Sequence, residues 1–226
     1  MGSYRLRRVI AVLVLLIIAA VPLSKTALEL PTLEEVIASN RDDSSDVPAS
    51  LAVLEVKGRA PKTGYERSEF GNGWSSSAGC DTRNRILARD LTDIISYDGC
   101  KVDQGTLDDP YTGTTMAFVR GETTSDDVQI DHVVALSNAW QTGAQQLSYE
   151  RRVIFSNDPL NLMAVSGPAN EQKSDSDAAT WLPANKSFRC TYINRQVSVK
   201  AKYDLWVTVA ERDAMARVLD SCKTTA

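Results

Sequence analysis

The sequence predicts an α+β domain whose loops are stapled by disulfides. Runs rich in β-branched and apolar residues at 115–120, 128–134 and 160–165 are typical of strands. Other segments carry apolar residues at helical spacing. The chain has four cysteines, an even number, and they are widely spaced without a Cys-x-x-Cys pair. That pattern indicates a disulfide framework in an oxidising compartment.

The N-terminal residues have the features of a targeting segment. Three arginines precede an apolar run from Val9 to Leu23. Such a run is typical of a secretory signal peptide, and it is just long enough to anchor a chain in a membrane. We therefore expect residues 1–24 to be a signal peptide or N-terminal anchor, residues 25–49 a linker or stalk, and residues 50–226 the functional domain. Both interpretations place that domain outside the cytoplasm.

Helical patterns occupy much of the predicted domain. Ile86, Leu87 and Leu91 lie at helical spacing, and Thr208 with Glu211 forms a capping box that opens a helix. The Gly- and Ser-rich stretch 64–79 is expected to be an ordered loop anchored by its aromatic residues, Trp74 among them. The expected helices are 82–91, 136–144, 148–155, a short one from Ala169 or Asn170, and 208–219.

The four cysteines, Cys80, Cys100, Cys190 and Cys222, allow three pairings. We favour Cys80–Cys100 and Cys190–Cys222 because each closes the shorter loop. The sequence alone does not decide between the pairings.

The charge balance limits the class of partner. The formal net charge is −4, and removal of the leader arginines makes the body more acidic. An acidic body argues against wrap-around, non-specific nucleic-acid binding, although it permits a local basic groove.

The single histidine of the chain, His132, follows Asp131 inside an apolar, β-branched run. Both groups cost free energy to bury unless other groups satisfy them. Two interpretations are open at this point: a hydrogen-bonded structural histidine, or the imidazole of an active site.

Downstream polar residues favour the second interpretation. Asn161 lies on the next predicted strand, and Asn170 and Lys173 lie on the short helix that follows. In this order of elements the sequence resembles the HNH, or His-Me finger, endonucleases, which have a ββα-metal core. Further stretches resemble the secreted bacterial branch of that family, typical of actinobacteria. They are 64–71, 79–84, 109–113, 181–183 and 189–192. Serines 75–77 depart from the pattern, because acidic residues are expected there.

The resemblance implies a role for each residue. His132 would be the general base, with Asn161 and Lys173 as further catalytic residues. Asp131 and Asn170 would hold one divalent cation, magnesium by preference, manganese as an alternative and zinc less favoured. Asp131 and His132 are neighbours, so an extended strand would point them to opposite faces. The strand must therefore bend or end there if both serve one site.

Each residue also has a structural alternative. Asp131 could cap a turn, Asn161 could tie the hairpin together, and Asn170 could cap the short helix. Lys173 could bind substrate phosphate or carry a solvated charge. Arg83 is a second candidate for substrate binding, or it could form an ion pair with Asp81.

The functional prediction is a metal-dependent endonuclease that cleaves DNA, with RNA as a second candidate substrate, and has little sequence preference. No zinc finger or helix-turn-helix that could read bases is present in the sequence. A monomer is expected, with membrane contact only if the N-terminal segment is retained. The alternatives are a binding protein on a retired nuclease scaffold and, less favoured, a Ser- or Cys-based hydrolase.

Overall fold

The computed structural model describes residues 51–122 and 124–222, which belong to the compact unit formed by residues 46–226. The predicted signal peptide or anchor (1–24) and linker (25–49) lie outside the described residues. Within the two described ranges, no helix is long and apolar enough to cross a membrane.

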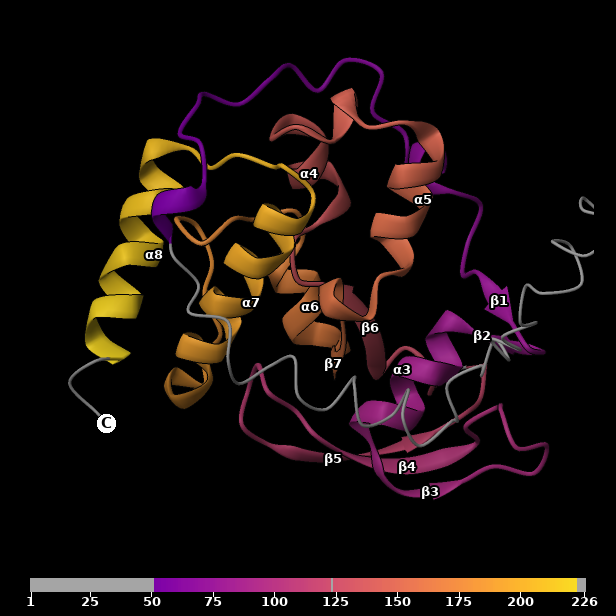
Figure 1. The fold of residues 1–226 in the computed structure, drawn as a ribbon. Coiled ribbons are helices and arrows are strands. Elements are labelled where there is room, and N and C mark those ends of the chain that lie inside the picture. The colour runs from indigo at the N-terminus through magenta and orange to yellow at the C-terminus, as the bar shows by residue number, and fades with distance from the viewer. Residues whose placement is uncertain (1–50, 123, 223–226) are drawn as a thin grey trace, which may run out of the picture. The chain divides into compact units, whose positions relative to one another are not determined.

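Helices and short strands alternate along the chain (Figure 1), which makes the fold α+β as predicted. The elements in order are η1 (Leu51–Val53), η2 (Arg67–Phe70), β1 (Ser76–Ser77), β2 (Cys80–Asp81), α3 (Thr82–Asp90), β3 (Thr92–Ile95), β4 (Gln104–Asp108), β5 (Thr115–Val119), β6 (Val128–His132), α4 (Leu136–Gln141), η3 (Ala144–Gln146), α5 (Tyr149–Asn157), η4 (Pro159–Asn161), β7 (Leu162–Ser166), α6 (Gly167–Lys173), η5 (Lys186–Phe188), α7 (Arg189–Lys202) and α8 (Val209–Cys222).

The central element is the antiparallel hairpin of β6 and β7, in which Asp131 pairs with Met163 and His132 with Leu162. Figure 1 shows this hairpin between α3 and the β3–β4–β5 sheet on one side and α6 and α7 on the other. Helix α6 starts directly where β7 ends. The hairpin and the helix therefore follow each other in the predicted order.

Side chains alternate between the two faces of the hairpin, as in any strand pair. We call one side the Asp131 face; its apolar residues, Val133, Met163 and Val165, join the core built with α7 and α8. The other side is the His132 face, whose apolar residues join the core built with α3. They are Val128, Ile130, Leu162 and Ala164. Burial on both faces explains why β7 is apolar from Leu162 to Val165.

Local sequence rules account for several element boundaries. The Asp81 side chain accepts a hydrogen bond from the Asn84 N–H at 2.7 Å and so caps α3. The capping box before α8 is confirmed, because Thr208 Oγ1 accepts from the Glu211 N–H at 3.1 Å. The helix continues to Cys222, past its predicted end.

Three predicted details are corrected by the structure. Asn161 lies at the end of the 3₁₀ turn η4 and not on the strand that follows. Helix α6 begins at Gly167, so Asn170 lies inside the helix and does not cap it. The predicted helix 136–144 divides into α4 and η3 around Gly143, whose φ of 130° is unfavourable for other residues.

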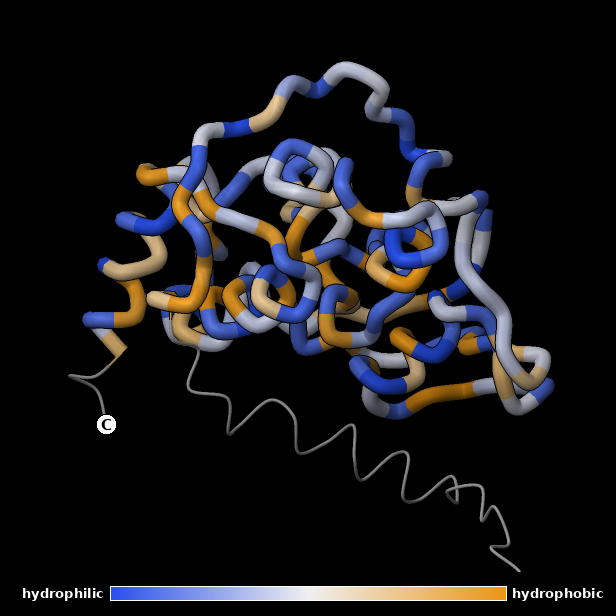
Figure 2. Tube along the Cα trace, turned by 45° about the horizontal axis from the view of Figure 1, so that its top comes forward, coloured by the Kyte–Doolittle hydropathy of each residue, from blue (hydrophilic) through white to orange (hydrophobic). Residues whose placement is uncertain are grey.

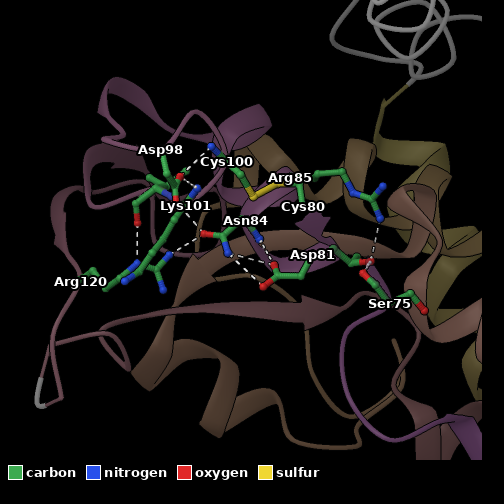
Figure 3. Close-up of a disulfide and its surroundings, with 11 residues drawn as sticks. Ser75, Cys80, Asp81, Asn84, Arg85, Asp98, Cys100, Lys101 and Arg120 are labelled. Atoms are coloured by element: carbon green, nitrogen blue, oxygen red, sulfur yellow. Dashed lines mark hydrogen bonds between the residues drawn. A yellow bond between two sulfur atoms is a disulfide. The ribbon is translucent and has the colours of Figure 1, made fainter. Parts of the chain in front are cut away.

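Both favoured disulfides are present, Cys80–Cys100 and Cys190–Cys222. Figure 3 shows the surroundings of the first. There Asn84 lies between Asp81 and Arg120, whose guanidinium donates to Asn84 Oδ1 at 2.6 Å. This disulfide fixes the start of α3, under the His132 face. The second joins α7 to α8, on the side of the Asp131 face.

Candidate active site

Asp131 is buried with a counter-ion already in place. Its Oδ1 accepts a hydrogen bond from Lys173 Nζ at 2.9 Å, and its Oδ2 accepts one from the Tyr111 hydroxyl. The Lys173 side chain is 0 % exposed and also donates to the backbone oxygen of His132 at 2.9 Å. Burial raises the pKa of Asp131, whereas the Lys173 ammonium acts to lower it. Lys173 is therefore an internal cation and not a solvated charge.

The His132 imidazole is held from the opposite side of the hairpin. Its Nε2 lies 2.9 Å from the backbone oxygen of Ser156, in α5. A carbonyl oxygen can only accept, so Nε2 carries the proton and the Nδ1 lone pair is left to act as a base. Burial lowers the pKa of His132 to about 3, which keeps the ring neutral at physiological pH.

Two further residues surround the imidazole. The Trp74 ring stacks on it, with centroids 5.7 Å apart and planes 13° apart. Arg67, at the start of η2, brings an exposed positive charge close enough to help lower the pKa of His132. Helix η2 is itself tied to this region, because Ser156 Oγ donates to the Phe70 oxygen at 2.6 Å. Trp74 thus covers the ring on the His132 face, and Arg67 adds a positive charge near it.

Asn161 positions the segment that follows His132. Its Oδ1 accepts from the Val134 N–H at 2.8 Å, and its backbone oxygen accepts from the Val133 N–H at 2.8 Å. Two arginines hold the turn that carries Asn161: Arg89 and Arg195 both donate to the backbone oxygens of Pro159 and Leu162. The contacts of Asn161 are therefore with the backbone and not with the imidazole.

Asn170 lies on the same face as Asp131. Its Nδ2 donates to Gln129 Oε1 at 2.8 Å, and Gln129 lies two residues before Asp131 on β6. The Asn170 amide and the Asp131 carboxylate supply oxygens of the kind that hard divalent cations prefer. In this set, however, the Lys173 ammonium occupies one carboxylate oxygen. Elsewhere in the described ranges, no group of three or more His, Cys, Asp or Glu residues is placed to hold a metal ion.

Arg83 has a different role from the predicted ion pair with Asp81. Its Nη2 donates to the backbone oxygens of Ser125 and Val128, at 3.0 and 3.1 Å. Burial lowers its pKa, with a further lowering from the nearby Arg120 charge. In this arrangement Arg83 fixes the start of β6.

The predicted site residues therefore gather in one unit, from β6 to α6, but on two faces. Strand β6 ends at His132, but Asp131 and His132 are both still paired with β7, so the carboxylate and the imidazole point away from each other and the bend that one shared site would require is not present. The sequence reasoning did not identify the roles of Tyr111, Trp74 and Arg67. Their only signal was that each lies in or beside a stretch that resembles the secreted nucleases.

Comparison with known proteins identifies the family. Residues 81–218 match the family described as GmrSD restriction endonucleases, C-terminal domain. The chain belongs to this family and is thus a nuclease-family domain, which confirms the predicted resemblance to endonucleases.

One relative is similar in sequence over almost the whole chain. It is an uncharacterized secreted protein of Arthroderma benhamiae, 35% identical over 210 residues, which cover 92% of this chain and 98% of that protein. No solved structure matches the chain.

Proposed function

We propose that this protein is an extracytoplasmic endonuclease that hydrolyses phosphodiester bonds in DNA, and in RNA as a second substrate, with little sequence preference. The observation that carries the proposal is a neutral imidazole with a free Nδ1, held at the end of β6 in a nuclease-family domain. The name of the secreted relative supports a location outside the cytoplasm.

In the proposed reaction, His132 Nδ1 takes a proton from water as the water oxygen attacks phosphorus. The bond from phosphorus to the leaving sugar oxygen breaks, this oxygen takes a proton from solvent water, and His132 returns its proton to solvent. Ser156 keeps the ring oriented through Nε2–H, and Asn161 keeps the end of β6 in place. The exposed Arg67 guanidinium would pair with the negative phosphate beside the imidazole.

The donor set fits a hard divalent cation in kind, and Asp131 and Asn170 would hold it, magnesium by preference. When bound, the cation supplies stabilisation of the negative charge that develops on the phosphate and the leaving oxygen. For this, Lys173 must leave Oδ1 and the Tyr111 hydroxyl must leave Oδ2 of Asp131, and the end of β6 must turn so that the carboxylate and the imidazole reach the same phosphate. Once released, Lys173 could serve as the predicted phosphate contact.

The decisive experiment follows nicking of plasmid DNA by the purified domain with magnesium, manganese or zinc. His132→Gln is the sharpest variant, because the Gln amide can still donate to the Ser156 oxygen but supplies no base. We expect His132→Gln and His132→Ala to lose about a thousandfold in rate. Wild-type cleavage by His132→Gln would overturn the mechanism. Circular dichroism of both variants checks that the fold is retained.

A second candidate is a binding protein on a retired nuclease scaffold. The observation that favours it is the Lys173 ammonium in place at Asp131, a stable arrangement without a metal. Calorimetry with magnesium, manganese and zinc separates the candidates. A folded domain that takes up none of these ions would support the binding protein.

A further inference from the structure

A second basic site lies away from the His132 face, in a pocket between η5, the start of α7, and α8. We call it the α7–α8 pocket. Its volume is about 430 Å³, within the usual range for ligand sites. Three cationic residues line it: Lys186, Arg189 and Arg217. None of the described residues that line it is acidic.

The floor of the pocket is apolar and rigid. Leu182, Ala214 and Val218 line it, and Ala214 and Val218 belong to α8. Figure 2 shows hydrophobic and hydrophilic residues alternating along this helix as it leads to the C-terminus. Cys190 also lines the pocket, and its disulfide to Cys222 fixes α7 against α8. Such a pocket would bind an anion that also has apolar surface.

The cations are placed to meet a ligand. Arg189 Nε donates to the Pro183 oxygen at 2.8 Å, which holds the guanidinium while its Nη groups donate to no other described residue. Lys186 and Arg217 are exposed. The N-terminal end of α7, which carries Arg189, has no side-chain cap, and its helix dipole adds to the positive potential.

Aromatic contacts connect the surroundings of Asp131 to the segments that line the pocket. The Tyr111 hydroxyl donates to Asp131, and the Tyr111 ring lies 4.9 Å from the Trp181 ring and 6.5 Å from the Phe188 ring. Each of these two residues directly precedes a residue of the pocket, Leu182 and Arg189. The pocket is therefore built on segments that pack around Tyr111.

We propose that the α7–α8 pocket binds a backbone phosphate of the nucleic-acid strand, away from the bond that is cut. This inference rests on the proposed function and names how the substrate is held. The cations would pair with the phosphate, and the apolar floor would take the sugar carbons. An acidic protein needs such a local contact, because its overall charge of −4 repels nucleic acid.

The test measures binding of a fluorescent single-stranded oligonucleotide by anisotropy, in EDTA and in the His132→Gln background so that no cleavage occurs. We compare Lys186→Ala/Arg217→Ala with Arg212→Ala. The control is matched, because Arg212 lies on the same helix and is paired with Asp213 at 2.8 Å, outside the pocket. We expect about tenfold weaker binding for the double variant and a salt slope reduced by about 0.7, because one phosphate contact of a single strand is lost.

Equal affinity and equal salt slope of the double variant and the Arg212→Ala control would overturn the proposal. Binding of inorganic phosphate to the pocket without binding of the oligonucleotide would also overturn the proposal, because it would indicate a site for small anions. The outcome is separable from the proposed function: binding is read without cleavage. As a second readout, the double variant in the wild-type background should raise KM for DNA and leave kcat for bis(p-nitrophenyl) phosphate unchanged.

Discussion

The two faces of the β6–β7 hairpin both bury a polar group, but they satisfy it in different ways. On the Asp131 face, a carboxylate is neutralised by Lys173 and hydrogen-bonded by Tyr111. On the His132 face, a neutral ring is covered by Trp74 and held by one backbone oxygen. A buried charge requires a counter-charge, whereas a buried imidazole can give up its charge and keep one nitrogen available. The Asp131 face thus holds a buried ion pair, which we call the charged centre, whereas the His132 face holds a neutral imidazole that can act as a base.

The largest expected effect is a loss of stability when one partner of the Asp131–Lys173 ion pair is removed. Asp131→Asn leaves the Lys173 ammonium buried without its counter-ion, and Lys173→Met leaves the carboxylate alone. Each variant should lower the free energy of unfolding in urea by about 3–5 kcal/mol, and the double variant by less than the sum. The control is the Glu55–Lys57 pair, which is about half exposed and should couple by 0–1 kcal/mol at most. Equal coupling in both pairs would contradict the comparison.

The second prediction concerns the affinity of the domain for magnesium. If Lys173 competes for Asp131, Lys173→Met should bind magnesium more tightly, because the removed charge lay 2.9 Å from Oδ1. Two unit charges about 4 Å apart interact by about 4 kcal/mol at an effective dielectric constant of 20, so a gain of at least about tenfold is expected. Calorimetry with magnesium chloride measures it, with Lys57→Met as the control. Unchanged or weaker affinity would show that Lys173 does not compete.

The last effect concerns pH and the His132 face, and it is smallest when measured over a single pH unit. Burial lowers the pKa of His132 to about 3 in the folded protein, against an ordinary pKa of 6.5, so the unfolded chain binds one more proton between these values. Stability of the metal-free protein is therefore full above pH 6.5 and is lost as pH falls toward 3, by up to about 1.4 kcal/mol per pH unit. Urea unfolding in EDTA at several pH values measures this slope. The His132→Gln variant should lack the part of this pH dependence that comes from protonation of His132 in the unfolded chain. Equal slopes for the wild type and the variant would argue against a buried neutral ring.

Local sequence patterns predicted the helices that are stabilised by residues close to one another in the sequence. Helix α3 has regular apolar spacing and an aspartate cap, and α8 has its capping box, so both were predictable. Helix α7 was not predicted, because Ile193 and Val197 are β-branched and favour a helix only through packing against α8 and the hairpin.

Long-range contacts set the limit of the prediction for the site. The order Asp131, His132, Asn161, Asn170 and Lys173 was visible in the sequence, but not which face each residue would occupy. Tyr111 lies 20 residues from Asp131, and Trp74 comes from a separate loop. No periodicity links such residues. The pairing of Lys173 with Asp131, across 42 positions, was likewise not accessible from the pattern.

The buried ammonium of Lys173 also bears on whether the domain can fold before it binds a metal ion. Structural zinc domains need their ion in order to fold, so chelators denature them. Here the chain brings its own cation to the carboxylate, so the hairpin can assemble in a compartment that offers no free metal. The domain would then be complete but idle until it meets the ion, and a chelator should stop it without unfolding it.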